Sequence, residues 1–201
     1  MLQNLKIQNF KGWQNTGQIK MAPITLFFGT NSSGKSSIGH FLMMLKQTVQ
    51  SSDRKAVLYP GDKNSAVQLG SFHEMVFKRD LRKKITFSYE WDLNKELKFK
   101  DAVAGNGYAV QHMGFEGKIA MQEGGGQALF MEELHYTLNA GNDEELFIGM
   151  VKKKSGKKKA YDVYAENYPL KRNTGRVWYP GTPVRFYGFT LIFLTGYFII
   201  I

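Results

Sequence analysis

The sequence predicts an α/β (α+β) fold, in which one strand–loop–helix unit is followed by an antiparallel sheet. Residues 38–49 carry apolar side chains at helical spacing, directly after a glycine-containing loop. Residues 85–93 instead alternate apolar and polar side chains, which is typical of a strand with one buried face. The chain has 201 residues, about the size of one domain.

The composition excludes several classes of protein. The chain is 43% hydrophobic and can therefore bury a core, which argues against a disordered protein. It has no cysteine, which excludes a disulfide scaffold and a thiolate zinc site, and its four histidines share no metal-ligand spacing. The net charge of +10 indicates an anionic partner such as a nucleotide, a nucleic acid or a membrane surface. No signal peptide precedes the first strand-like run, so the cytoplasm is the expected location.

The first thirty residues predict strands. Leu5, Ile7 and Phe10 are separated by polar residues, and Lys11–Gly12 provides a turn into a second strand. Residues 24–28 form a short, almost continuous apolar run after a proline. Such a run predicts a strand buried on both faces in the middle of a sheet.

The helical segment comes next and should end near Gln50–Ser52, where its apolar spacing stops. Residues 53–70 contain proline and glycine and predict a loop. Ser71 and Glu74 have the spacing of a capping box, so a short helix is expected to begin at Ser71.

The second half of the chain predicts an antiparallel meander. After the alternating run 85–93, Asn94–Lys95 has the composition of a turn into a further strand. Glycines separate the later apolar runs and are interpreted as breaks between short strands. These strands are expected at residues 108–113, 118–122, 128–131, 146–151 and 160–164.

The loop before the helix carries the clearest chemical signal, because residues 29–36 match the Walker A pattern. Its glycines allow the backbone to wrap N–H groups around a phosphate, and the helix N-terminus adds its dipole. Lys35 can reach the β- and γ-phosphates, the Ser36 hydroxyl can bind Mg²⁺, and Ser37 could contact the α-phosphate. The alternative is a glycine-rich turn with an incidental lysine. The candidate residues for binding ATP and Mg²⁺ are Gly29, Asn31, Ser32, Ser33, Gly34, Lys35, Ser36 and Ser37.

Three segments resemble the ABC/SMC/RecF-like ATPases: Leu5–Gly12, Pro23–Phe28 and Asn31–Ser37. The closest likeness is to bacterial AAA-family ATPases of the OLD-like type, which end in a domain of unknown function. Leu69–Phe72 and Pro183–Phe189 also resemble segments of that group. The resemblance implies the N-terminal lobe of an ABC-type P-loop NTPase head, with a mixed sheet around the phosphate-loop helix and an antiparallel β subdomain.

The resemblance also implies partners and two more site residues. In that family two heads sandwich ATP, and its members act in DNA repair, chromosome maintenance or defence against phage. ATP, DNA and a second ATPase head in a homodimer are therefore the expected partners. Lys11 and Trp13 are expected near the nucleotide, with Lys11 at a phosphate and Trp13 stacked on the base. The alternative for this pair is a turn lysine and a half-buried aromatic side chain.

Two motifs that the family uses for hydrolysis cannot be placed. These are an apolar strand ending in Asp-Glu and, before it, a Ser-Gly-Gly-Gln-like signature. Residues 124–127 and 129–133 resemble them superficially, but they are almost contiguous, and Glu132 stands where the aspartate should be. A short strand bounded by glycines explains both segments. Gln68 is a weak candidate for the family's Mg²⁺-sensing glutamine. No catalytic residue is assigned, and the chain alone is expected to hydrolyse ATP poorly or not at all.

A lysine-rich hairpin gives a rival function, a non-enzymatic nucleic-acid-binding module. Apolar runs on either side of residues 152–159 predict paired strands with a basic tip. Clustered lysines can neutralise DNA phosphates, although a solvated loop that protects an edge strand explains the same pattern. The candidate residues are Lys152, Lys153, Lys154, Lys157, Lys158 and Lys159.

The last residues differ from the rest of the chain. Residues 1–189 are expected to form the ATPase lobe, whereas residues 190–201 form an apolar tail. The tail is shorter than the ~20 residues that a spanning helix needs, so stable membrane insertion is not expected. The leading explanation is a reading frame truncated or frameshifted near Phe189, which is where the resemblance stops. A native tail buried against the sheet or a partner comes second, and a membrane anchor third.

Overall fold

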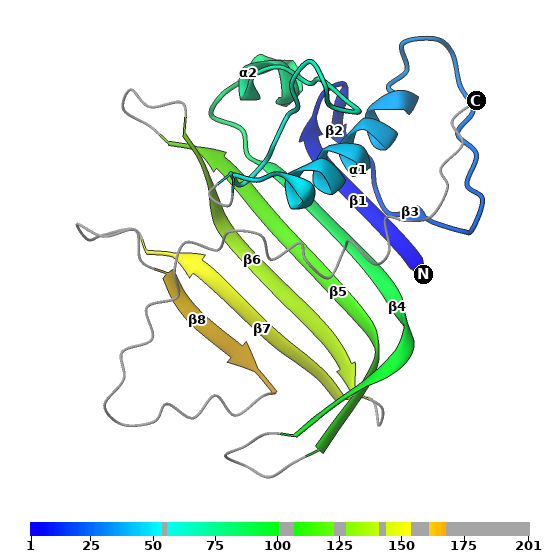
Figure 1. Cartoon of the computed structure of the whole chain (residues 1–201), viewed down its shortest axis with the longest axis vertical. Helices are drawn as coiled ribbons and strands as arrows, with labels where there is room; N and C mark the ends of the chain where they lie inside the picture. Colours follow the sequence, from blue (N-terminus) through cyan, green and yellow to red (C-terminus); the bar gives the residue numbers. More distant parts are fainter. Residues whose placement is uncertain (54–55, 101–106, 123–127, 141–143, 154–160, 168–201) are drawn as a thin grey trace.

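The described part of the chain is one antiparallel sheet with a helix across one face (Figure 1). The computed structural model describes residues 1–53, 56–100, 107–122, 128–140, 144–153 and 161–167. Its elements are β1 Leu2–Phe10, β2 Trp13–Asn15, β3 Ile19–Lys20, α1 Lys35–Gln50, α2 Phe72–Met75, a 3₁₀ turn Phe77–Arg79, β4 Ile85–Lys100, β5 Gly107–Met121, β6 Leu129–Ala140, β7 Glu144–Lys152 and β8 Tyr161–Glu166. Within these residues, no helix combines the length and the hydrophobicity needed to cross a membrane.

The eight strands lie in the order β2-β1-β4-β5-β6-β7-β8, and β3 also pairs with β1. The predicted meander is confirmed, because β4 to β8 follow one another across the sheet. It is not a separate subdomain, since β1 pairs directly with β4. All pairs among the described strands are antiparallel, so they include none of the parallel pairs that the resemblance implies for a mixed sheet.

Helix α1 docks on the sheet through aromatic side chains. The Phe41 ring meets Phe10 of β1 at a centroid distance of 5.0 Å and Phe87 of β4 at 5.1 Å, both edge to face. All three side chains are fully buried. The apolar spacing that predicts the helix therefore marks the face that covers β1 and β4, and this packing fixes where the N-terminus of α1 lies.

The prediction of a buried strand at residues 24–28 is wrong. No strand forms there, and the side chains of Ile24, Leu26 and Phe28 are 69%, 44% and 78% exposed. Within the described chain, the backbone of these three residues makes no hydrogen bond. The apolar run shows that the segment can be buried, but burial also requires neighbouring strands, and the described residues place none beside it.

Two predicted breaks in the sheet are also wrong. Residues 94–95 do not form a turn, because β4 continues to Lys100 with a register shift between Asp92 and Leu97. Glycines likewise do not interrupt β5. At Gly117 a Cβ atom would lie 3.0 Å from the Phe115 ring and 3.2 Å from the Phe87 ring, so this glycine makes room for aromatic packing.

The predicted capping box at the start of α2 is confirmed. Glu74 accepts a hydrogen bond from the Ser71 backbone N–H at 2.7 Å, and the chain turns into the helix at that point. This bond is the main reason why the pKa of Glu74 lies below its usual value. The loop that leads into α2 is also tied to α1, where the buried Gln47 side chain donates to the Tyr59 carbonyl at 2.9 Å.

Candidate phosphate-binding site

The loop of residues 29–34 reaches α1 through backbone angles that favour glycine. Gly34 caps the helix with φ 92° and ψ 5°, in the left-handed region. Ser32 also has a positive φ, 65°, which is uncommon for a residue with a side chain. A Cβ atom at Gly34 would lie 2.7 Å from the indole nitrogen of Trp13, so both the angle and the packing require glycine here.

Backbone donors gather where the loop becomes a helix. Within the described chain, the N–H groups of Gly34, Lys35 and Ser36 make no hydrogen bond. The first turn of α1 carries no acidic side chain, so nothing in that turn neutralises the positive end of the helix dipole. An anion with several oxygens, such as a phosphate, matches this arrangement.

Lys35 turns back over the loop that precedes it. Its ammonium group donates to the carbonyl oxygens of Gly29 at 2.7 Å and Thr30 at 3.0 Å. The positive charge is therefore held beside the first residues of the loop. Ser36 is exposed, and its hydroxyl makes no hydrogen bond in the described chain, so it is free to bind a ligand.

A protein-only metal site is absent from the described chain, which has no group of three or more His, Asp or Glu side chains that could hold an ion. Mg²⁺ often binds through few protein ligands together with phosphate oxygens and water. A single hydroxyl such as that of Ser36 beside a phosphate site fits that mode of binding.

The structure separates the two residues that were expected beside the nucleotide. Trp13, the first residue of β2, donates its indole N–H to the Gly34 carbonyl oxygen at 2.9 Å. Lys11 points elsewhere, because its ammonium group lies 3.4 Å from the Leu69 carbonyl oxygen, next to α2. Trp13 therefore adjoins the loop, whereas a contact between Lys11 and a phosphate stays a prediction.

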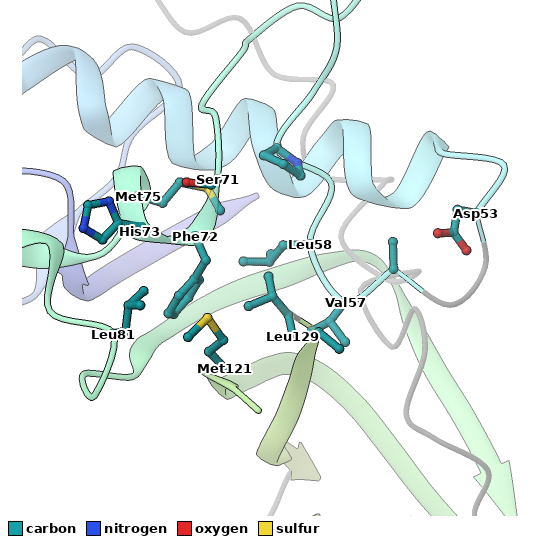
Figure 2. Close-up of a pocket in the computed structure, with 13 residues that line it drawn as sticks. Asp53, Val57, Leu58, Ser71, Phe72, His73, Met75, Leu81, Met121 and Leu129 are labelled. Carbon is teal, nitrogen blue, oxygen red and sulfur yellow. The ribbon is translucent and has the colours of Figure 1, made fainter. Parts of the chain in front are cut away.

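A cavity of about 430 Å³ lies at the opposite end of α1 (Figure 2). The loop after α1, helix α2 and the adjoining ends of β5 and β6 surround it, with largely apolar side chains such as Val57, Phe72 and Leu129. Helix α1 has 16 residues and spans roughly 24 Å, so this cavity is separate from the phosphate loop. Among the described residues that line it, none is a lysine or an arginine. The sequence does not predict this cavity, because its lining comes from five separate segments.

A family model described as an AAA ATPase domain matches residues 1–172. The chain belongs to this family. A search of curated proteins finds no match for the chain. The matched residues of this AAA ATPase domain include the phosphate loop and every described strand, and an ATPase domain binds a nucleotide. The candidate donors for its phosphates lie in the loop at the N-terminus of α1.

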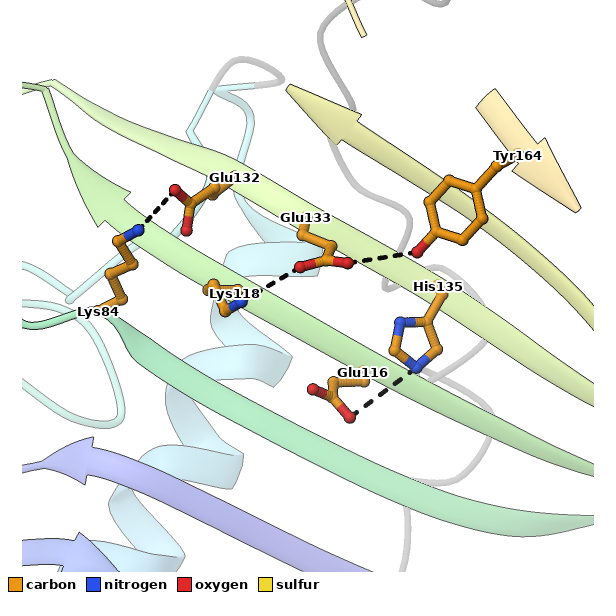
Figure 3. A network of polar contacts seen from close by, with 7 residues as sticks. All are labelled: Lys84, Glu116, Lys118, Glu132, Glu133, His135 and Tyr164. Carbon is orange, nitrogen blue, oxygen red and sulfur yellow. Dashed lines mark hydrogen bonds and ion pairs between the residues drawn. The ribbon is translucent and has the colours of Figure 1, made fainter. Parts of the chain in front are cut away.

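The acidic pair Glu132 and Glu133 of the AAA ATPase domain lies on β6, where both side chains face lysines (Figure 3). Glu133 pairs in register with Lys118 of β5, next to Gly117, which is the partner of Phe87. Side chains alternate along a strand, so Glu133 is on the face opposite to α1. Glu132 forms an ion pair with Lys84 at 2.6 Å. Both glutamates are thus strand residues engaged with lysines, as the alternative interpretation predicts.

The same face holds a wider polar network (Figure 3). Glu133 contacts Lys118 at 3.2 Å and accepts a hydrogen bond from the Tyr164 hydroxyl at 3.3 Å. Burial, helped by this carboxylate, raises the pKa of Tyr164 to about 12. Burial lowers the pKa of His135, although Glu116 lies 3.8 Å away and opposes that change. These contacts join β5, β6 and β8 and give the face a structural role.

Other expected motifs of the AAA ATPase domain are only partly described. Residues 124–127, which resemble the signature, lie outside the described residues, and Gln68 is exposed in the loop before α2. The predicted hairpin is confirmed as the pair β7–β8. Lys152 lies 3.3 Å from the centroid of the Phe130 ring, and Lys153 pairs with Asp162 at 2.8 Å. The remaining lysines of the tip, Lys154, Lys157, Lys158 and Lys159, lie outside the described residues.

Proposed function

We propose that this domain binds Mg-ATP through residues 29–37, as part of an ABC/SMC-like ATPase head of the OLD-like type. The supporting observation is the set of unpaired N–H groups at Gly34, Lys35 and Ser36, beside the Lys35 ammonium group. These N–H groups would hold the β-phosphate, and Lys35 would exchange its carbonyl partners for β- and γ-phosphate oxygens. Ser36 would provide one ligand for Mg²⁺, which when bound neutralises phosphate charge.

Hydrolysis is not assigned to this chain alone. Water must be positioned for in-line attack, and the metal needs an acidic partner. Glu132 and Glu133 are engaged in ion pairs with Lys84 and Lys118. We propose that a second ATPase head would complete the site for hydrolysis. DNA is proposed as a further partner of the domain.

A panel of ligands tests the phosphate-binding role directly. We expect the affinity, measured by isothermal titration with Mg²⁺, to be similar for ATP and inorganic tripolyphosphate. AMP should bind at least about tenfold more weakly, because it loses charge-assisted contacts to two phosphates. Chelation of Mg²⁺ should weaken ATP binding as well.

The same panel can reject the proposal. Equal affinity for AMP and ATP, or no binding of tripolyphosphate, would mean that the loop of residues 29–37 does not hold a phosphate chain. An affinity for ATP that does not change when Mg²⁺ is removed would exclude the proposed role of Ser36 as a Mg²⁺ ligand.

The lysine-rich hairpin supports a second function, the binding of nucleic acid. Lys152 and Lys153 lie at the end of β7, and the sequence between β7 and β8 contains four more lysines. Such a cluster would bind DNA without sequence preference and with strong dependence on salt. Lys152 contacts the Phe130 ring and Lys153 pairs with Asp162, so both side chains would be oriented. The Asp162 carboxylate would also offset the charge that Lys153 offers to DNA.

Salt titration distinguishes this function from a solvated hairpin. If the lysines bind DNA, the variant K152A/K153A/K154A should reduce the slope of log affinity against log salt by up to about 2.7. The matched control K95A/K98A/K100A removes the same charge from the exposed end of β4 and should leave the slope closer to that of the wild type. Identical slopes for the wild type and the hairpin variant would exclude the hairpin as a DNA-binding element.

A further inference from the structure

We propose that Trp13 is a positioning residue for the phosphate loop, which it holds through the Gly34 carbonyl oxygen. This inference rests on the proposed function, since it concerns the same loop. It assigns Trp13 a different role from stacking on the base.

The Gly34 carbonyl and the Lys35 N–H belong to one peptide group. In a planar trans peptide, the carbonyl oxygen and the following N–H point in opposite directions. A bond that fixes the Gly34 carbonyl therefore also fixes the Lys35 N–H, one of the unpaired donors at the start of α1. Trp13 makes such a bond from its indole N–H at 2.9 Å.

Gly34 needs an external restraint of this kind. With no side chain and φ at 92°, its backbone can rotate more freely than that of any other residue type. The Gly34 carbonyl also accepts the Ser37 N–H at 3.0 Å, which ties it to the helix. Two donors from different parts of the chain thus hold one peptide plane, which prepares the loop for phosphate before the ligand arrives.

Trp13 is itself held firmly enough to serve as a support. It begins β2 and pairs in register with Phe10, which is fully buried in the core. Its indole packs partly against that core and closely against Gly34. The hairpin of β1 and β2 therefore connects the sheet to a loop that lies 21 residues further along the chain.

Positioning of the loop and stacking on the base predict different losses of affinity when Trp13 is replaced. Tripolyphosphate has no base, so its binding distinguishes the two roles. W13F keeps an aromatic ring but removes the N–H donor. We expect it to weaken binding of Mg-ATP and Mg-tripolyphosphate by the same factor, about threefold to tenfold, because one hydrogen bond is lost. Q14A changes an exposed neighbour on the same strand and should leave both affinities unchanged.

Two further measurements separate positioning from a general loss of stability. In the wild type, the indole N–H resonance of Trp13 should shift when Mg-tripolyphosphate is added, although this ligand has no base to stack. G34A places a methyl group against the indole and also strains the backbone at φ 92°, so it should weaken both ligands partly through the contact with Trp13. The affinity of the double variant W13F/G34A should then fall by a smaller factor than the product of the factors for the two single variants.

Three outcomes would overturn the inference. If W13F binds both ligands as tightly as the wild type, the Gly34 contact does not position the loop. If W13A weakens ATP alone while W13F changes neither ligand, Trp13 stacks on the base instead. If the wild type binds neither ligand, the proposed function fails and this inference fails with it.

Discussion

Alanine at Lys35 should weaken binding of Mg-ATP roughly a hundredfold, a loss of about 3 kcal/mol from contacts to charged phosphate oxygens. The ammonium group of Lys35 lies beside Gly29 and Thr30 through hydrogen bonds to their carbonyl oxygens. It is the only cation that the first turn of α1 carries, so no neighbour in that turn can replace it. Isothermal titration of K35A with Mg-ATP and Mg-tripolyphosphate measures the loss, which should be similar for both ligands.

Lys46 offers a matched control on the same helix. K46A removes the same charge and the same length of side chain, about 16 Å further along α1. We expect its affinity for Mg-ATP to stay within about twofold of the wild type, because salt screens a charge at that distance. An equal loss in both variants would show that the net charge of the domain, and not the loop, governs binding.

Alanine at Phe41 should lower the free energy of unfolding by about 3–5 kcal/mol, the usual range when a buried phenylalanine leaves a cavity. Phe41 is fully buried and joins α1 to two strands, through Phe10 and Phe87. The variant F41A therefore loosens the docking of α1 as well as the core. Chemical denaturation followed by circular dichroism measures the change.

Met43 is the control for Phe41, since it lies two residues away on the exposed side of α1. M43A should change the free energy of unfolding by less than about 0.5 kcal/mol. A loss of under about 1 kcal/mol in F41A would contradict the docking of α1 against β1 and β4.

The sequence was a good guide wherever the signal lies within a few residues. Helix α1 and the capping box of Ser71 and Glu74 follow local spacing, and the structure has both. It also has the antiparallel meander, although β4 and β5 continue through predicted breaks. Predictions fail where the outcome depends on distant neighbours. The apolar run 24–28 is exposed because no described strand lies beside it, and residues 94–95 continue a strand because both flanking segments pair with β5.

The candidate site divides in the same way. The Walker A pattern could be found from the sequence because its glycines, lysine and serines are contiguous. The hydrogen bond from Trp13 to Gly34 could not, since it depends on how the β1–β2 hairpin folds against a loop 21 residues away. The acidic pair on β6 agrees with the interpretation of these residues as ordinary strand residues, since Glu133 lies on the face of the sheet opposite to α1.

The pairing of β1 with β4 also determines when, during synthesis of the chain, the phosphate loop and α1 can dock on the sheet. Asn4 and Glu90 lie opposite each other across these strands, although 86 residues separate them in the chain. The phosphate loop leaves the ribosome long before β4 exists, and α1 has no Phe87 to pack on until then. Closing so long a segment is slow compared with forming a helix. The candidate phosphate loop is therefore translated early, whereas the helix that follows it can dock fully only late, when β4 is available.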